Sequence, residues 1–160
     1  TGVNFEPELL LALTKECSNI VGIKDSTGDV TMTLEYIEAC GGKISILQGR
    51  EPLIFATLAQ GGHGSINSWA NVAPSLAIEI YDAVMKRDYE RAVRAQSKLT
   101  SLRVAFGAEA NAVKEAMSIL GLPAGIARRP LLPLSQQERE KLRKHLLNLE
   151  LLKDTTSQKK

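Results

Sequence analysis

Lys24 is the residue of this sequence whose type and position could support covalent chemistry. It directly follows Asn19–Ile23, a short apolar and β-branched run with the composition of a strand. Apolar neighbours on a strand desolvate a lysine and thereby favour its neutral, nucleophilic amine. Such an amine can attack a ketone and form an imine, which draws electrons from a neighbouring carbon–carbon bond. On spacing alone, however, a lysine that only flanks a strand and pairs with Asp25 is the commoner case.

Glycines mark the ends of the next two apolar runs, where a ligand could approach the backbone. Gly49 follows the run Lys43–Leu47, and the segment Gly61–Gly64 places glycines on both sides of His63. Glycine leaves backbone N–H and C=O groups accessible, although ordinary turns use it equally often. The spacings of phosphate-binding and dinucleotide-binding loops are absent. His63 could be a general base or a metal ligand, but a lone histidine between glycines is more often a packed or surface residue.

The composition excludes several classes of function. The 160 residues are 44% hydrophobic and 24% charged, which is ordinary for one globular chain. The 20 basic and 18 acidic residues nearly balance and only 4% are aromatic, so we expect neither nucleic acid nor a membrane as partner. No apolar run is long enough to span a bilayer. Cys17 and Cys40 suit neither a disulfide framework nor a zinc site, which predicts reduced thiols in a cytoplasmic protein.

Alternating strand and helix patterns must position Lys24 and the glycines. Strand-like runs at 19–23, 43–47 and 61–66 alternate with stretches of helical periodicity, joined by short connections. This order predicts an α/β fold with a parallel sheet, in which active sites form at the carboxyl ends of the strands. From about residue 87 onward only helical patterns follow. The helices expected on this basis span about 9–17, 30–40, 52–59, 71–85, 89–106, 109–120 and 135–151.

The change of pattern also predicts how the chain is divided. Residues 1–86 form the strand–helix part, residues 87–152 form a helical extension, and the polar residues 153–160 are expected to be disordered. Three strand–helix units cannot close a barrel, and an open sheet would expose two unpaired edges. The chain also begins Thr1-Gly2-Val3 without a methionine. We therefore interpret it as an excerpt that a missing N-terminal portion, or another chain, completes.

Four segments carry a family resemblance when they are taken together and in order. They are Thr1-Gly2-Val3, the stretch Val21–Asp29 around Lys24, Gln48–Glu51, and the stretch Gly61–Pro74 with its GGHGSINS and ANVAP sequences. The helices that follow contribute Leu120-Gly121-Leu122 and the proline-flanked segment Arg129–Leu134. Together these segments resemble the dihydrodipicolinate synthase / N-acetylneuraminate lyase superfamily of class I aldolases, and the match covers nearly the whole chain.

The resemblance implies a fold and a set of site residues. Residues 1–86 would be the C-terminal part of a (β/α)8 TIM barrel, namely its last three strands, and residues 87–152 the family's C-terminal helical extension. Lys24 would form the imine with pyruvate or a related 2-oxo acid. Gly49 and Ile66 would line the substrate pocket, the latter through its backbone carbonyl. The family uses no metal and no organic cofactor, and it is usually homo-oligomeric, commonly as a homotetramer.

The activity implied is the condensation or cleavage of pyruvate with an aldehyde, as in 4-hydroxy-tetrahydrodipicolinate synthesis. Arg50-Glu51 and Asn111–Lys114 differ from residues common in the synthases, which leaves N-acetylneuraminate lyase or 2-keto-3-deoxy sugar acid aldolase activity open. The acceptor could be aspartate semialdehyde, a sugar or a small aldehyde. The family's proton-relay tyrosine and carboxylate-binding arginine lie upstream of Thr1, so the chain alone is expected to turn over poorly. An inactive half-barrel assembly module, or a binding regulator on the same fold, is the alternative to an enzyme.

Overall fold

The computed structural model describes residues 3–153, and the tail predicted to be disordered lies outside them except for Lys153. Within these residues a three-stranded parallel sheet is surrounded by helices. The strands β1 (Gly22–Asp25), β2 (Ser45–Gln48) and β3 (Gly64–Ser65) are hydrogen-bonded in that order. The helices are α1 (Pro7–Glu16), α2 (Val30–Cys40), α3 (Ile54–Ala59), α4 (Pro74–Met85), α5 (Tyr89–Phe106), α6 (Ala110–Ile119) and α7 (Gln136–Asn148), with 3₁₀ turns η1 (Glu51–Leu53) and η2 (Trp69–Asn71).

The strands begin later in the chain than their composition predicts. The apolar run predicts a strand over 19–23, whereas β1 begins at Gly22 and includes Lys24 and Asp25. Pairing with β2 decides this, because the last two residues of β1 lie opposite the last two of β2. The third strand is shortened to two residues, since Gly61 adopts φ +97° as the chain turns out of α3. Lys24 is therefore part of its strand and not the residue after it.

Most helix ends follow local sequence rules. The Asp29 side chain caps α2 by accepting a hydrogen bond from the N–H of Thr31 at 2.8 Å. Ser135 and Glu138 form the capping box that their spacing predicts at the start of α7. Prolines occupy the first turns of α1 and α4, where no N–H partner is needed. The seven predicted helices are confirmed as α1–α7, with ends shifted by a few residues.

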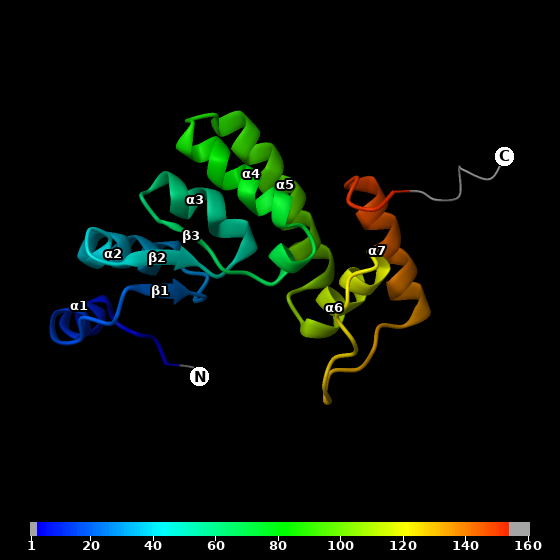
Figure 1. Ribbon diagram of the computed structural model, residues 1–160, viewed down its shortest axis with the longest axis horizontal. Helices are drawn as coiled ribbons and strands as arrows, with labels where there is room; N and C mark the ends of the chain where they lie inside the picture. The colour runs from blue at the N-terminus through cyan, green and yellow to red at the C-terminus, as the bar shows by residue number, and fades with distance from the viewer. Residues whose placement is uncertain (1–2, 154–160) are drawn as a thin grey trace.

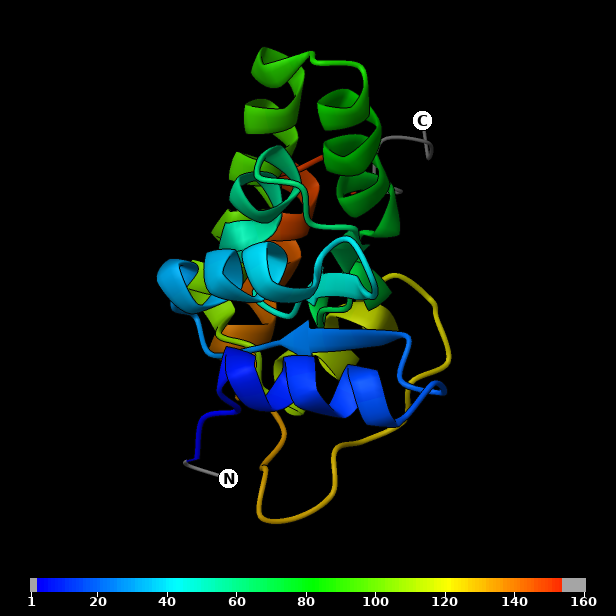
Figure 2. The same ribbon diagram turned by 90° about the vertical axis from the view of Figure 1, so that its left-hand side faces the viewer.

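Two hydrophobic clusters hold these elements together. The smaller joins α1, α2 and the sheet through Leu10, Tyr36, Cys40, Ile44 and Ile46. The larger runs from α3 through α4 and α5 to α6 and α7, and it contains the fully buried Trp69. Figure 1 shows the sheet with α1–α3 at one end of the molecule and α6 and α7 at the other. Figure 2 looks onto β1 and α1, and no strand pairs with the outer edge of β1 within residues 3–153.

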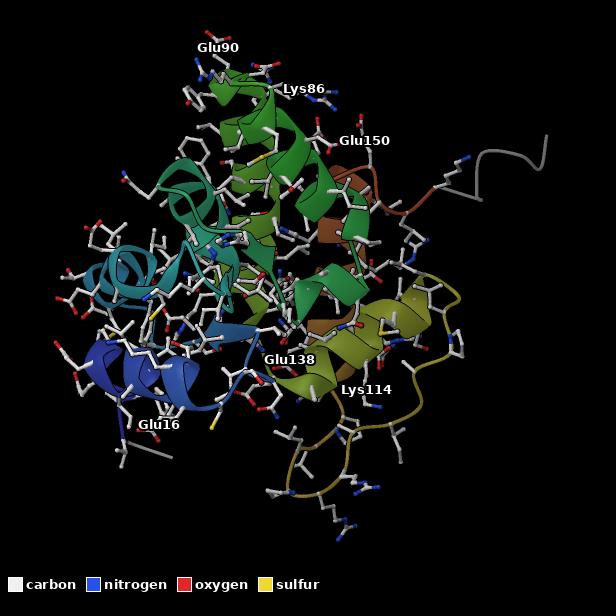
Figure 3. All side chains as sticks on the ribbon, turned by 60° about the vertical axis from the view of Figure 1, so that its left-hand side comes forward. Glu16, Lys86, Glu90, Lys114, Glu138 and Glu150 are labelled. Carbon is white, nitrogen blue, oxygen red and sulfur yellow. The ribbon has the colours of Figure 1, made fainter. Side chains whose placement is uncertain are left out.

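The surface carries both signs of charge, in keeping with the nearly balanced composition. In Figure 3 the side chains of Glu16, Lys86 and Glu150 project outward from different elements. Both cysteine thiols are free, and Cys40 is fully buried as a small apolar residue of α2. Across residues 3–153 no helix combines the length and the apolar character that crossing a membrane requires.

His145 on α7 contacts two residues of α5. Its ring packs edge-on against Phe106, and its Nε2 atom lies 2.9 Å from the hydroxyl of Ser101. Burial, and then the charge of Lys141, lower the pKa of His145 below its ordinary value of 6.5. The unfolded chain therefore binds a proton more readily than the folded protein. We expect the free energy of unfolding to be highest above about pH 6.5. It should decrease as the pH falls from there to the pKa of His145 in the folded state.

Urea unfolding at about pH 8 and about pH 5 measures this dependence, with His145→Gln as the control variant. Glutamine can still bond to Ser101, but it does not titrate. The difference between the two pH values should therefore be smaller in the variant than in the natural protein. An identical difference in both proteins would show that other groups carry the pH dependence.

Candidate active site

The three residues singled out in the sequence lie at the carboxyl ends of the three strands. Lys24 is the third of the four residues of β1, while Gly49 directly follows β2 and Ile66 directly follows β3. The N–H of Gly49 donates to the Asp25 carbonyl at 2.6 Å, and the N–H of Ile66 donates to the Gln48 carbonyl at 2.9 Å. These bonds continue the parallel pairing past the strand ends. In parallel α/β folds this is the edge of the sheet at which active sites form.

The side chain of Lys24 lies directly against Gly49. A Cβ atom at Gly49 would sit 3.0 Å from Cε of Lys24 and 2.1 Å from Oγ of Ser26, so only glycine leaves room here. Strand alternation separates Lys24 from Asp25, which is 2% exposed and faces the helices. Ile66 is 53% exposed, and its carbonyl oxygen accepts no hydrogen bond from residues 3–153. The structure thus brings the predicted lysine and glycine into contact.

The expected desolvation of Lys24 is not provided by the described residues. Its side chain is exposed, on the face of the sheet opposite to α1 and α2. The salt bridge to Asp25 that would explain an ordinary strand-flanking lysine is also absent from residues 3–153. The reason for both is geometric, because adjacent strand residues point to opposite faces and only one face is covered. Residues 3–153 therefore leave this amine open to solvent on that face.

A buried polar network fixes the end of β1. The carboxylate of Asp25 accepts hydrogen bonds from the N–H and the hydroxyl of Thr27, at 2.8 and 2.7 Å, and from the hydroxyl of Thr33 on α2. The fully buried Gln48 donates to hydroxyls on α2 and α3, at 3.4 and 2.9 Å. A fully satisfied buried network is rigid. Asp25 therefore anchors the turn after Lys24.

A hollow of about 660 Å³ opens beside Lys24. Burial, and then the charge of Asp25, raise the pKa of Tyr36, so this phenol remains protonated and donates a hydrogen bond to the Phe5 carbonyl. Arg50 was not predicted to be a site residue; its sequence signals are its place directly after Gly49 and its difference, together with Glu51, from residues common in the synthases. The wall of the hollow includes residues 3–5, Lys24–Thr27, Tyr36 and Arg50.

The histidine beside the third strand has a structural setting. His63 is exposed, and it exchanges two hydrogen bonds with Ile46: its N–H donates to the carbonyl at 2.9 Å, and its Nδ1 accepts from the N–H at 3.2 Å. Gly62 is buried, and a Cβ there would lie 2.4 Å from Cγ2 of Thr57, so this glycine allows close packing against α3. The interpretation of His63 as a packed or surface residue agrees with these contacts. No metal-binding group of three His, Cys, Asp or Glu side chains occurs in residues 3–153.

A buried ion pair joins the strand ends to the helical extension. Glu51 is fully buried, and its carboxylate accepts hydrogen bonds from the N–H of Trp69 at 3.1 Å and from Nη1 of Arg103 at 3.4 Å. The indole N–H of Trp69 donates to the Gly107 carbonyl at 2.7 Å, and Gln96 donates to the Glu51 carbonyl at 2.7 Å. Helix α5 thereby positions the segments that follow β2 and β3. No local sequence pattern indicates these contacts, because their partners are 18 to 52 residues apart.

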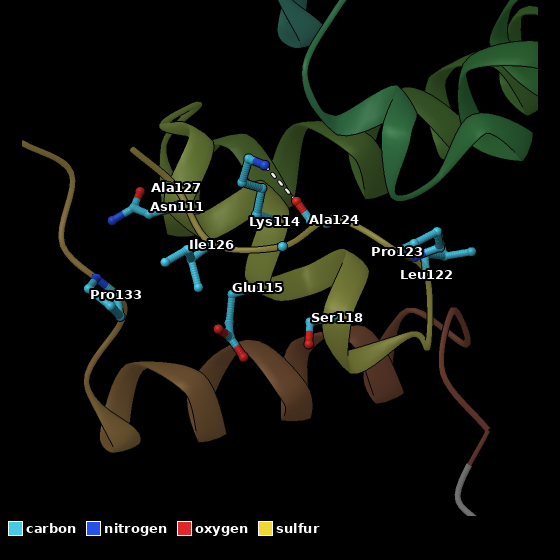
Figure 4. Close-up of a pocket in the computed structure, with 11 residues that line it drawn as sticks. Asn111, Lys114, Glu115, Ser118, Leu122, Pro123, Ala124, Ile126, Ala127 and Pro133 are labelled. Carbon is cyan, nitrogen blue, oxygen red and sulfur yellow. Dashed lines mark hydrogen bonds between the residues drawn. The ribbon is translucent and has the colours of Figure 1, made fainter. Parts of the chain in front are cut away.

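A second hollow, of about 360 Å³, lies on the helical extension between α6 and the segment that follows it (Figure 4). Its polar side chains hold that segment in place. Lys114 donates to the Ala124 carbonyl at 2.6 Å, and Asn111 donates to the Leu132 carbonyl at 2.8 Å. Both of these side chains therefore bond to the protein's own backbone. We assign this hollow a structural role and place the candidate active site at Lys24.

Comparisons with known proteins identify relatives with the same arrangement of elements. The model of the dihydrodipicolinate synthetase family matches residues 1–149. The chain is 37% identical over 154 residues to a 4-hydroxy-tetrahydrodipicolinate synthase of Methanopyrus kandleri, covering 95% of this chain and 51% of that protein. A prophage protein of the dihydrodipicolinic acid synthase family from E. coli K12, solved in complex with pyruvate, matches with a TM-score of 0.86 and 28% identity, over 95% of this chain and 53% of that one. Dihydrodipicolinate synthase from Thermotoga maritima matches with a TM-score of 0.84 and 30% identity, over the same two shares.

The chain spans about half the length of these relatives. Its α/β architecture, with three parallel strands and the helices around them, agrees with the matching parts of the solved structures. The family model and the sequence identity agree with each other over nearly all of the chain. This chain belongs to the dihydrodipicolinate synthetase family.

Proposed function

We propose that this chain supplies the imine-forming lysine of a pyruvate-dependent class I aldolase with 4-hydroxy-tetrahydrodipicolinate synthase activity. The observation that carries the proposal is the contact of Lys24 with Gly49 at the carboxyl end of a parallel sheet, in a member of this family. The names of two relatives support it, because one is called a 4-hydroxy-tetrahydrodipicolinate synthase and the other was solved with pyruvate.

In the proposed reaction the neutral amine of Lys24 attacks the ketone carbon of pyruvate, and loss of water gives the imine. The protonated imine withdraws electrons from the adjacent methyl carbon, which loses a proton and then attacks the aldehyde carbon. The aldehyde oxygen takes up a proton as the new carbon–carbon bond forms. Gly49 provides the space beside the amine, and the Ile66 carbonyl lines the pocket. The scheme requires no metal and no organic cofactor.

The same proposal assigns β1–β3 to the last three strands of a (β/α)8 barrel, within residues 1–86, and residues 87–152 to its helical extension. The outer edges of β1 and β3 have no strand partner within residues 3–153, and the matched relatives are about twice as long as this chain. An N-terminal half of the barrel would pair with these edges and cover Lys24. Assembly as a homo-oligomer and a cytoplasmic location remain predictions.

Reduction with borohydride in the presence of pyruvate tests the proposal. The protein, purified at its natural length, is expected to gain one reduced pyruvate per subunit by intact mass, and only when both reagents are present. If the folded protein gives no adduct, the enzyme proposal fails. An inactive assembly module or a binding regulator on the same fold would then be the better account.

Replacement of Gly49 by alanine is expected to slow imine formation roughly 10- to 100-fold, because misplacing a reacting group by about 1 Å can cost that much. The new Cβ would lie 2.7 Å from the Asp25 carbonyl oxygen as well as against Ser26 and Lys24, so the amine must shift. Gly42→Ala is the matched control, since nothing lies within 4 Å of a Cβ there. The rate of pyruvate incorporation on reduction measures both variants. Equal rates in the two would contradict the fit described for Lys24.

A further inference from the structure

Arg50 faces the candidate site, yet the proposed imine chemistry gives it no task. It directly follows Gly49 and lines the same hollow of about 660 Å³ as Lys24. Its guanidinium lies over the turn that follows β1, where Nε donates to the Ser26 carbonyl at 3.0 Å and Nη2 donates to the Thr27 carbonyl at 3.2 Å. Both carbonyls belong to the turn that follows Lys24 and β1.

These contacts hold the guanidinium in one orientation. The N–H of Arg50 donates to the side chain of Gln48 at 2.9 Å, and Gly28, with φ +82°, brings its backbone so close that a Cβ would lie 2.9 Å from Nε. A guanidinium carries five N–H donors, of which the two carbonyls occupy two. No carboxylate among residues 3–153 forms an ion pair with Arg50. A preorganised set of donors therefore remains for a ligand.

The charge of the hollow favours anions. Lys24 and Arg50 both line it, whereas Asp25, the acidic residue among its described lining residues, is 2% exposed and is bonded to Thr27 and Thr33. The permanent charge of the Arg50 guanidinium in this concavity raises the local concentration of anionic ligands. A guanidinium binds a carboxylate or a phosphate through two parallel charge-assisted hydrogen bonds, which are stronger than those to neutral hydroxyl groups.

We propose that Arg50 selects acceptor aldehydes that carry an anionic group, a carboxylate or a phosphate, over neutral sugar aldehydes. This inference rests on the proposed imine chemistry at Lys24. The carboxylate of pyruvate is bonded directly to the imine carbon and stays near Nζ of Lys24. Arg50 is anchored on carbonyls two and three residues further along the chain. The acceptor is the reactant that extends away from the imine, toward the turn that Arg50 holds.

The test compares kcat/KM for three aldehydes at saturating pyruvate, with the protein at its natural length and with Arg50→Gln and Arg50→Lys. Aspartate semialdehyde carries a carboxylate, glyceraldehyde 3-phosphate carries a phosphate, and glyceraldehyde is neutral. Glutamine keeps amide donors for the turn but removes the charge. We expect the ratio of anionic to neutral kcat/KM to fall about 10- to 100-fold in Arg50→Gln, mainly through KM. Arg50→Lys keeps the charge but lacks the planar guanidinium, so its ratio should lie between those of the natural protein and of Arg50→Gln.

Because the ratio compares aldehydes on the same variant, a general loss of folded protein lowers both kcat/KM values equally and leaves the ratio unchanged. The anionic aldehyde with the larger fall identifies whether carboxylate or phosphate is the natural group. An equal loss for all three aldehydes would give Arg50 a purely structural role and overturn the inference, as would a natural preference for glyceraldehyde. Trapping with pyruvate alone separates the two proposals. Without an adduct both fail, whereas an adduct without anion preference refutes only the role of Arg50.

Discussion

Replacement of Lys24 by arginine is expected to abolish imine formation with pyruvate and to lower turnover by at least about 10³-fold. Arginine keeps the positive charge and a long side chain, but its guanidinium is not deprotonated in proteins and cannot attack a ketone. The loss would therefore be one of nucleophilic chemistry and not of charge. Borohydride-dependent incorporation of pyruvate and the steady-state rate, both at the natural length of the protein, measure the two effects.

Lys43→Arg is the matched control for this substitution. Lys43 is also exposed, but it precedes β2 and so lies at the opposite end of the sheet from Gly49. Turnover of this variant should stay within about twofold of the natural protein, as expected for a surface substitution. Lys24→Ala further separates an enzyme from a binding regulator, which would still bind its ligand in calorimetry. Turnover of Lys24→Arg within about tenfold of the natural rate would contradict the role proposed for Lys24.

Replacement of Glu51 by alanine is expected to lower the free energy of unfolding by about 3–5 kcal/mol. The carboxylate is fully buried, and its loss leaves the guanidinium of Arg103 and the N–H of Trp69 without their acceptor. Arg103 is itself only 25% exposed, so water replaces the missing partner incompletely. Urea unfolding measures the change. Because these contacts span η1, η2 and α5, the effect should appear as a shift of the whole transition.

Two further variants show whether burial causes this effect. Glu51→Gln keeps an oxygen for the N–H of Trp69 and should cost less, about 1–3 kcal/mol. Glu90→Ala removes a carboxylate that is 92% exposed and pairs with Arg94 at 3.7 Å, so it should cost no more than about 0.5 kcal/mol. A loss for Glu51→Ala as small as that for Glu90→Ala would mean that the buried pair does not hold the strand ends to the extension.

Sequence patterns predicted well those helix starts that are fixed by neighbouring residues. Helices α2 and α7 begin within one residue of the predicted starts at 30 and 135, where the side chains of Asp29 and Ser135 cap them. The start of β1 was predicted too early, because strand propensity favoured Ile20 and Val21 over Lys24 and Asp25. Pairing with β2 and the buried partners of Asp25 decide the actual range, and both come from residues distant in sequence.

The candidate site could also be predicted only in part, because some of its contacts join residues distant in sequence. Strand order alone places Lys24, Gly49 and Ile66 at one edge of the sheet, and the structure brings the first two into contact. The exposure of Lys24 agrees with the commoner case of a strand-flanking lysine, and the desolvation expected from its apolar neighbours is not seen, since a strand pattern cannot show which face another element covers. Arg50 was missed because its anchors are the Ser26 and Thr27 carbonyls, 24 and 23 residues earlier, and backbone carbonyls carry no residue-type signal.

Peptide mapping after reductive trapping tests the central claim most directly. The protein at its natural length is incubated with pyruvate and borohydride, digested, and analysed by mass spectrometry. Reduced pyruvate is expected on Lys24, in the peptide that contains Ile23 and Asp25, and not on the exposed Lys43. An adduct on a different lysine, or none in the folded protein, would contradict the assignment of Lys24 as the imine-forming residue.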